Sequence, residues 1–248
     1  MNKYVDFIDD EALIMAISKL YQVYQQSSAG KRFADINRNT LDPIKFQFDT
    51  MFLYDGDARQ TLTNEIFRQA DKSIANAMGA FHQTLIGSIY GFEETPYMPC
   101  DCKKSDNSMF IEVKNKHNTM NARSGEGVFQ ELNSLSRAYP RAMCYCVEVI
   151  SDRSHDSVWS LTVNGTTMQN DRIHKISADR FYAIATGDDR AFFKLCASLR
   201  EATYDFLDRT HASSGLALET DYPVFDELGL DDITSELFSK ALRHYNGF

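Results

Sequence analysis

The chain has 248 residues, 43% of them hydrophobic, which is enough apolar material for one large domain with a substantial core. No apolar run is long enough to span a membrane. The first ten residues contain three aspartates, which argues against a secretory signal. Because the chain shows no export features, its five cysteines are predicted to be free thiols. We therefore expect a cytoplasmic protein that does not bind membranes, and the net charge of −9 excludes one that holds nucleic acid through overall positive charge.

The first third of the chain is predicted to be helical. Asp9 or Asp10 can cap a helix whose apolar residues recur at helical spacing until residues 27–30 end it. A second helix is expected over residues 43–54, before an Asp-Gly-Asp stop, and a third over about residues 58–90.

A strand, a helix and a second strand follow a connector. Residues 108–113 read as a short strand, about 124–138 as a helix, and 141–150 as a central strand. This β-α-β order is that of a parallel crossover.

The rest of the chain is predicted to complete a mixed sheet and cover it. Residues 158–163 and 173–176 are two further strands, separated by the Asn164-Gly165 turn signal and its polar extension, and residues 188–209 and 231–245 are amphipathic helices. The predicted fold class is α/β (α+β), a central mixed sheet flanked by helices. We expect one domain over residues 1–248, with a helical part at 1–90, a sheet core at 91–180 and terminal helices at 181–248.

Two carboxylates and a lysine surround the first strand in an order that suits metal-dependent phosphodiester hydrolysis. Side chains alternate along a strand, so Glu112 and Lys114 project together, and Asp101 precedes the strand by a short connector. Two acids can hold Mg²⁺, which activates a bound water, and an adjacent ammonium can orient that water or stabilise developing charge.

The arrangement resembles the PD-(D/E)xK nuclease superfamily. The motif reads Pro99-Cys100-Asp101, ten residues, then Glu112-Val113-Lys114. The longer context resembles type II restriction endonucleases that cut GGNCC or GGWCC sites, in the segments EVKNKHNTMN (112–121), RQADKSIAN (68–76), FHQ (81–83) and LDPIKF (41–46). The sequence departs from the superfamily motif at Cys100, which is inserted between the proline and the aspartate. Because of this insertion, Asp106 is an alternative candidate for the first acid. We favour Asp101, because it leaves room for a turn before the strand.

The resemblance implies a restriction-endonuclease-like fold and a Mg²⁺-dependent enzyme that cuts both strands of double-stranded DNA at a short GC-rich palindrome. Asp101, Glu112 and the carbonyl of Val113 would ligate the metal, and Lys114 would position the attacking water. Glu65 and Gln130 would stand near the site, although exposed helix surface is the commoner explanation for each. A palindromic target favours a homodimer with one site per strand, and a partner methyltransferase would protect host DNA.

Other readings of the same residues stay open. An isolated E-x-K tripeptide is usually an edge strand that ends in solvated charges. A repair or recombination nuclease of the same superfamily would read DNA structure instead of sequence, and a catalytically silent DNA-binding module would need no metal. The pairs Cys100/Cys102 and Cys144/Cys146 suggest four zinc ligands, but this spacing is more typical of small buried side chains on a strand.

Charge and polarity suggest where DNA would bind. Residues 103–123 carry five basic residues against two acidic ones, whereas residues 219–236 carry seven acidic residues and no basic one. The loop after the strand offers side chains that pair with bases or phosphates, namely Lys116, His117, Asn118, Asn121 and Arg123. An equally suitable polar set lies in the region of the predicted hairpin: Asn164, Thr166, Gln169, Asn170 and Arg172.

Overall fold

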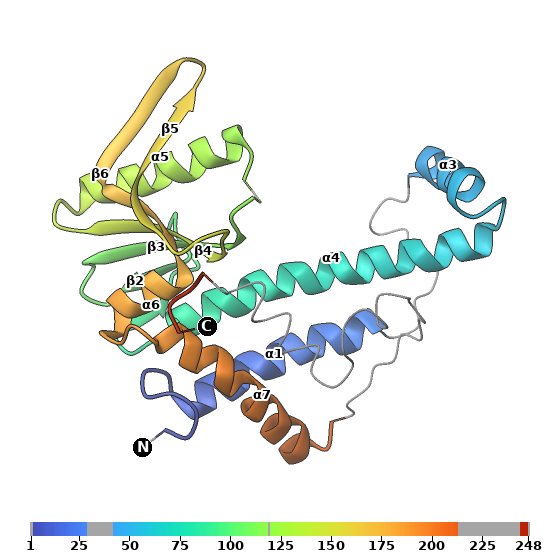
Figure 1. Cartoon of the computed structure of the whole chain (residues 1–248), viewed down its shortest axis with the longest axis horizontal. Helices are drawn as coiled ribbons and strands as arrows, with labels where there is room; N and C mark the ends of the chain where they lie inside the picture. The colour runs from blue at the N-terminus through green and yellow to red at the C-terminus, as the bar shows by residue number, and fades with distance from the viewer. Residues whose placement is uncertain (1, 29–41, 119, 213–243, 248) are drawn as a thin grey trace. The chain divides into compact units, whose positions relative to one another are not determined.

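The computed structural model describes residues 2–28, 42–118, 120–212 and 244–247 (Figure 1). Contacts divide the chain into two compact units, residues 1–17 with 79–248 and residues 18–78. Among the described residues, no helix is long and apolar enough to cross a membrane.

Residues 18–78 form a helical unit. It contains most of α1 (Asp10–Ser28), all of α3 (Pro43–Leu53) and most of α4 (Ala58–Gly87). The α3 helix begins where predicted, because the Asp42 side chain accepts hydrogen bonds from the backbone N–H groups of Ile44 and Lys45 and proline occupies the first helical position.

The larger unit is built on a six-stranded sheet. Its strands are β1 (Phe92–Glu94), β2 (Cys102–Lys104), β3 (Met109–Lys116), β4 (Met143–Ile150), β5 (Asp156–Val163) and β6 (Thr166–Ser177). They are ordered β1-β2-β3-β4-β6-β5, with β3/β4 and β4/β6 parallel and the other pairs antiparallel. The predicted mixed sheet is confirmed, as is the parallel crossover from β3 through α5 (Ala122–Ala138) to β4.

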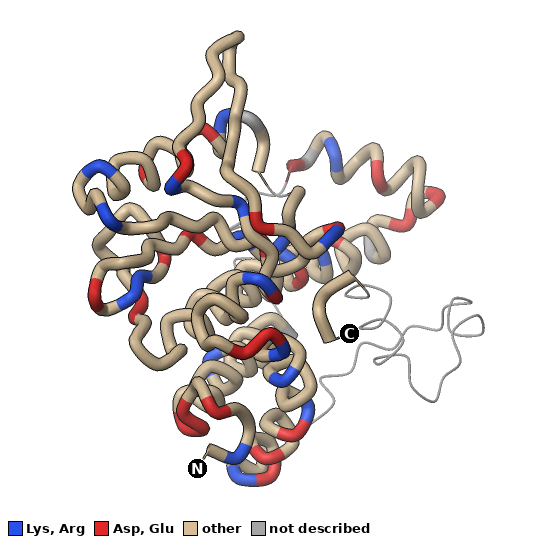
Figure 2. The backbone as a smooth tube through the Cα atoms, turned by 60° about the vertical axis from the view of Figure 1, so that its left-hand side comes forward, with Lys and Arg blue, Asp and Glu red and all other residues tan. Residues whose placement is uncertain are grey.

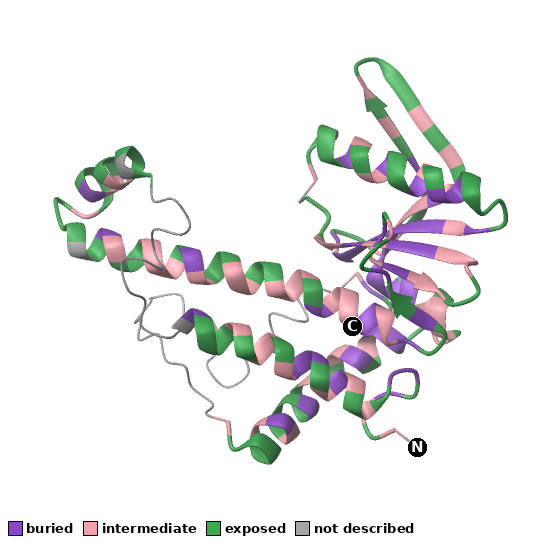
Figure 3. Ribbon diagram, turned by 180° about the vertical axis from the view of Figure 1, so that it is seen from behind, coloured by how far each residue is buried: buried purple, intermediate pink, exposed green. Residues whose placement is uncertain are grey.

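Helices cover both faces of this sheet (Figure 1). On one face, Phe129, Leu132 and Leu135 of α5 pack with buried residues that include Phe110 of β3, Cys144 and Cys146 of β4, and Ile173 of β6. On the other face lies α6 (Ala178–Thr186), whose Phe181 ring is 6.0 Å from that of Tyr145, and α7 (Ala191–Thr210) packs against α6. Buried residues are concentrated in the central strands, and the distal ends of β5 and β6 are largely exposed (Figure 3).

The structure adds elements that the sequence did not predict. The connector contains β1 and β2, which have three residues each and are rich in charge, so that no hydrophobic alternation marks them. The polar extension after Asn164-Gly165 is not a loop, because it is the first part of β6. The helix α6 was also not predicted. The predicted helix 231–245 lies largely outside the described residues, and the acidic segment 219–236 lies wholly outside them.

Candidate active site

Backbone pairing brings Asp101 and Glu112 together. The antiparallel register of β2 and β3 pairs Cys102 with Ile111, and continuing it by one residue places Asp101 opposite Glu112. Two hydrogen bonds fix this position: the backbone N–H of Asp101 donates to the Ile111 carbonyl at 2.9 Å, and the backbone N–H of Val113 donates to Asp101 Oδ2 at 2.7 Å.

The two carboxyl groups ionise less readily than free acids. Burial raises the pKa of Asp101, and the opposing hydrogen bond from Val113 and the charge of Lys114 do not fully offset it. Burial also raises the pKa of Glu112, and the negative charge of Asp101 raises it further. Two half-buried acids, of which Asp101 disfavours the ionisation of Glu112, form a donor set that a divalent cation would neutralise.

Lys114 completes the group as a cation. Its Nζ lies 2.6 Å from Glu112 Oε1, as expected for residues two apart on one face of a strand. Burial lowers the pKa of Lys114, but the hydrogen bond to Glu112 and the charges of Glu112 and Asp101 outweigh burial and leave the pKa raised. The amine is therefore held protonated, which suits charge stabilisation and not general base catalysis.

A neighbour that the sequence analysis did not single out is Gln83 of α4. Its side chain hydrogen-bonds the Asp101 carboxylate, and its backbone carbonyl accepts a hydrogen bond from Cys102 Sγ at 3.3 Å. Gln83 lies near the end of this long helix, and its isolated position in the sequence does not mark it as part of a site. The available signal was its place in the FHQ segment.

The alternative acid Asp106 lies elsewhere. Its Oδ1 accepts a hydrogen bond from the backbone N–H of Ser108, and its Oδ2 is 3.9 Å from Lys104 Nζ. The side chain is exposed. The structure thus brings Asp101, Glu112 and Lys114 into one group and leaves Asp106 in the turn before β3.

Comparisons with known proteins identify the family. The model of the Eco47II restriction endonuclease family matches residues 5–208. The chain belongs to this family. It is 34% identical over 226 residues to the type II restriction enzyme Sau96I of Staphylococcus aureus, covering 88% of this chain and 86% of that protein. It is 25% identical over 226 residues to the type II restriction enzyme Eco47II of Escherichia coli, covering 86% of this chain and 92% of that protein. No solved structure matches.

Membership of the Eco47II family confirms the predicted resemblance and enzyme class. The protein is a site-specific deoxyribonuclease of type II that acts on double-stranded DNA. Enzymes of this family generally use divalent metal ions. The roles of individual residues remain predictions. The contacts of each predicted residue show which of them also have a structural role.

The segment predicted to contact DNA spans the end of β3, the following loop and the first turn of α5, and it contains exposed residues and one helix cap. Asn121 is the N-cap of α5, and its Oδ1 accepts a hydrogen bond from the backbone N–H of Ser124 at 2.9 Å. Lys116, His117, Asn118 and Arg123 are exposed, and the backbone N–H of His117 donates to the Ile150 carbonyl at 3.0 Å. Asn121 therefore has a structural use that the sequence did not reveal.

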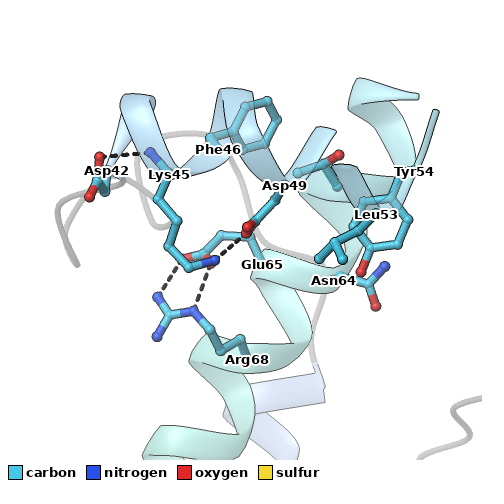
Figure 4. A pocket seen from close by; sticks show the side chains of 10 residues that line it. Asp42, Lys45, Phe46, Asp49, Leu53, Tyr54, Asn64, Glu65 and Arg68 are labelled. Atoms are coloured by element: carbon cyan, nitrogen blue, oxygen red, sulfur yellow. Dashed lines mark hydrogen bonds and ion pairs between the residues drawn. The ribbon is translucent and has the colours of Figure 1, made fainter. Parts of the chain in front are cut away.

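Glu65 lies in the helical unit and has local partners. Arg68 donates to both of its carboxylate oxygens, at 2.7 and 2.6 Å, and this pair lines a polar pocket with residues of α3 (Figure 4). The hydrogen bond from Arg68 lowers the pKa of Glu65. Gln130 is exposed on α5, where its Nε2 donates to Glu126 Oε1 at 3.2 Å. Nothing in these contacts connects either residue with Asp101 or Glu112.

Two residues of the predicted hairpin set attach β6 to α5. Asn170 Nδ2 donates to Asn133 Oδ1 at 2.9 Å and to Ser136 Oγ at 3.0 Å. Arg172 donates to the carbonyl of Ser136 at 2.6 Å and to other carbonyls beyond the end of α5. Asn170 and Arg172 therefore hydrogen-bond β6 to α5 and to the turn that follows it.

The cysteines are neutral thiols in hydrophobic surroundings. Burial raises the pKa of Cys144, Cys146 and Cys196 to about 12, and it also raises those of Cys100 and Cys102. Among the residues that the structure describes, no group of three or more His, Cys, Asp or Glu side chains is arranged to hold a metal ion.

The raised pKa of Asp101 predicts a stability effect. In the folded protein this group ionises at a higher pH than its ordinary value of 3.8, so the wild-type protein loses stability as pH rises from that value through the raised pKa. Asp101→Asn keeps an oxygen for the Val113 N–H and never ionises. In metal-free buffer we expect the variant to be more stable than wild type at neutral pH, with the advantage vanishing as pH falls below 3.8. Urea unfolding at a series of pH values measures this, and equal stabilities at neutral pH would contradict it.

Proposed function

We propose that this restriction endonuclease uses Mg²⁺ to cut both strands of DNA at a short GC-rich palindrome of the GGNCC type. The observation that carries the chemistry is the Asp101–Glu112 pair with Lys114 bonded to it. The target is supported by the resemblance of residues 112–121, 68–76, 81–83 and 41–46 to enzymes that cut such sites. A partner methyltransferase that modifies the same site belongs to this proposal.

The residues present fit a divalent metal ion. Asp101 and Glu112 would be its carboxylate ligands, and the carbonyl of Val113, between Glu112 and Lys114, would be a third. Bound there, Mg²⁺ would polarise the phosphodiester and lower the pKa of a water molecule.

The protein's own groups have separate tasks. Gln83 and the Val113 N–H hold the Asp101 carboxylate in place. Lys114, kept protonated by Glu112, orients the attacking water and stabilises negative charge on the phosphate as it develops. Half-burial of the two acids strengthens each of these electrostatic interactions.

Digestion of a sequenced plasmid tests the proposal. With Mg²⁺ we expect discrete fragments whose ends map to one short palindrome, while chelation of the metal stops cleavage. Lys114→Ala should reduce cleavage by at least about 100-fold, the cost of removing one group that stabilises transition-state charge, yet retain specific binding because it deletes one positive charge among several.

The outcome also separates the rival functions. Cleavage at branched or damaged DNA but not at a defined sequence would indicate a repair nuclease. Specific binding without cleavage by the wild-type protein would indicate a silent DNA-binding module. Near wild-type cleavage by Lys114→Ala would remove Lys114 from the mechanism.

Two segments are candidates for contact with the target bases. We propose that Lys116, His117, Asn118 and Arg123 contact DNA, with Asn121 acting through its cap of α5. The distal part of the β5–β6 hairpin is the second candidate, since residues 157–170 carry no charge and the hairpin tip bears none (Figure 2). Its outer face pairs Ser160 with Gln169 and Thr162 with Thr167, all exposed, and a two-stranded ribbon of this kind fits the major groove.

Alanine variants distinguish the two segments. A lost base contact should cost about 1 to 3 kcal/mol at one base position and relax discrimination there, whereas a lost phosphate contact should weaken binding to all sequences alike. We expect Asn118→Ala to show the first pattern and Lys116→Ala the second. Binding profiles against single-base variants of the site provide the measurement. Unchanged discrimination in Asn118→Ala with altered discrimination in Gln169→Ala would assign base reading to the hairpin.

We further propose that the enzyme acts as a homodimer, and that α3 supplies part of the interface. Apolar residues spaced along one side of α3 are 54% to 78% exposed, namely Ile44, Phe48, Met51 and Phe52. The rings of Phe48 and Phe52 stack on each other at 5.5 Å. A palindrome presents the same groups twice, so a second copy of this chain is the partner that the reaction needs.

The dimer proposal predicts the effect of one charge on this surface. Phe52→Glu should weaken self-association by at least about tenfold, equivalent to about 1.4 kcal/mol, without unfolding the protein, because the side chain is 78% exposed. Sedimentation equilibrium measures the association. Met15→Glu, which changes a residue 59% exposed on α1, is the matched control and should dimerise normally. A wild-type monomer, or an unaffected Phe52→Glu dimer, would contradict the proposal.

A further inference from the structure

A second charged cluster lies on the same face of the sheet as the candidate active site. Its centre is Glu148 of β4, whose side chain is only 5% exposed. Lys175 of β6 donates to Glu148 Oε1 at 2.9 Å, and His155 Nε2 lies 3.4 Å from Glu148 Oε2. None of these residues stood out in the sequence, because each is an isolated charge in its own segment.

Strand register places this cluster beside Glu112 and Lys114. The parallel pairs align Glu112 with Cys146 and Cys146 with Lys175 in one row, and Lys114 with Glu148 and Glu148 with Ser177 in the next. Aligned residues of neighbouring parallel strands project from the same face. Adjacent strands are about 4.8 Å apart, so Lys175 stands about 10 Å from Glu112 across the sheet.

Lys175 is held in place and remains accessible. Its Nζ sits between the Glu148 carboxylate and the Trp159 ring, 5.2 Å from the ring centroid, and its side chain is 29% exposed. Trp159 is buried against Phe129 of α5. A lysine fixed in this way loses little conformational entropy when it binds a ligand.

The more exposed charge of the cluster is positive. Glu148 faces two basic side chains, and its hydrogen bond raises the pKa of His155, so that the cluster gains positive charge as His155 protonates. The carboxylate is covered by its partners, and Lys175 is the more exposed member of the ion pair. Burying a carboxylate such as that of Glu148 costs free energy. A role in orienting Lys175 toward a ligand would explain why Glu148 is buried here.

We propose that Lys175 binds a backbone phosphate of the DNA beside the cleaved bond, and that Glu148 is the residue that positions it. The proposal rests on the function above, since it requires DNA to lie across the face that carries Asp101, Glu112 and Lys114. A separation of about 10 Å across the sheet is short enough for Lys175 to reach a phosphate close to the one that is cut.

The test is the salt dependence of DNA binding, measured without metal so that no cleavage occurs. Each phosphate contact contributes about 0.9 to the slope of log K against log salt. Lys175→Ala should reduce the slope by about this amount and weaken binding of cognate and unrelated duplexes by the same factor. Lys175→Arg should restore both. The matched control is Lys194→Ala, which removes a lysine of α7 that is also paired with a carboxylate, that of Asp188. This variant should leave the slope unchanged.

A second variant guards against misfolding, because Lys175→Ala leaves the buried Glu148 with less charge compensation. The double change Glu148→Gln with Lys175→Gln neutralises both partners and keeps hydrogen-bonding groups in each position. It should show the same reduced slope as Lys175→Ala. A folded double variant with the wild-type slope would overturn the inference alone. Failure of the wild-type protein to bind DNA would contradict the proposed function and, with it, this inference.

Discussion

The candidate site depends on the parallel pairing of β3, β4 and β6. Parallel strands align residues in rows, and here two adjacent rows contain Glu112, Lys175, Lys114 and Glu148. No short motif contains these four residues, which come from three strands separated by α5 and by the β5 strand. Once the register is set, their positions on one face follow, and a shift by one residue would turn them to the opposite face.

The same face is apolar at one end and charged at the other. Phe110, Cys144 and Ile173 form the first row under α5, and the acids and lysines occupy the rows that follow. The hydrophobic contacts of α5 therefore stabilise the part of the sheet from which the charged side chains extend. In this way the sheet can hold like-charged Asp101 and Glu112 close together although their burial opposes ionisation.

Much of the architecture could be predicted from the sequence because it depends on local patterns. The strand at residues 108–113, the helix after it and the strand at 141–150 were recognisable from periodicity, and their order implied the parallel crossover. The short charged strands β1 and β2 carry no such pattern, and β2 matters because its register places Asp101 opposite Glu112. Gln83, Glu148 and Lys175 were missed for the same reason, since their significance arises only from tertiary contacts.

The environment of the cysteines has a practical consequence for studying this enzyme. All five thiols are buried or half-buried, and burial raises the pKa of each, so few thiolates form near neutral pH and alkylating reagents will react with them slowly. A cysteine introduced at an exposed position would react much faster. Fluorescent dyes or spin labels can therefore be attached at chosen surface sites without first replacing the native cysteines.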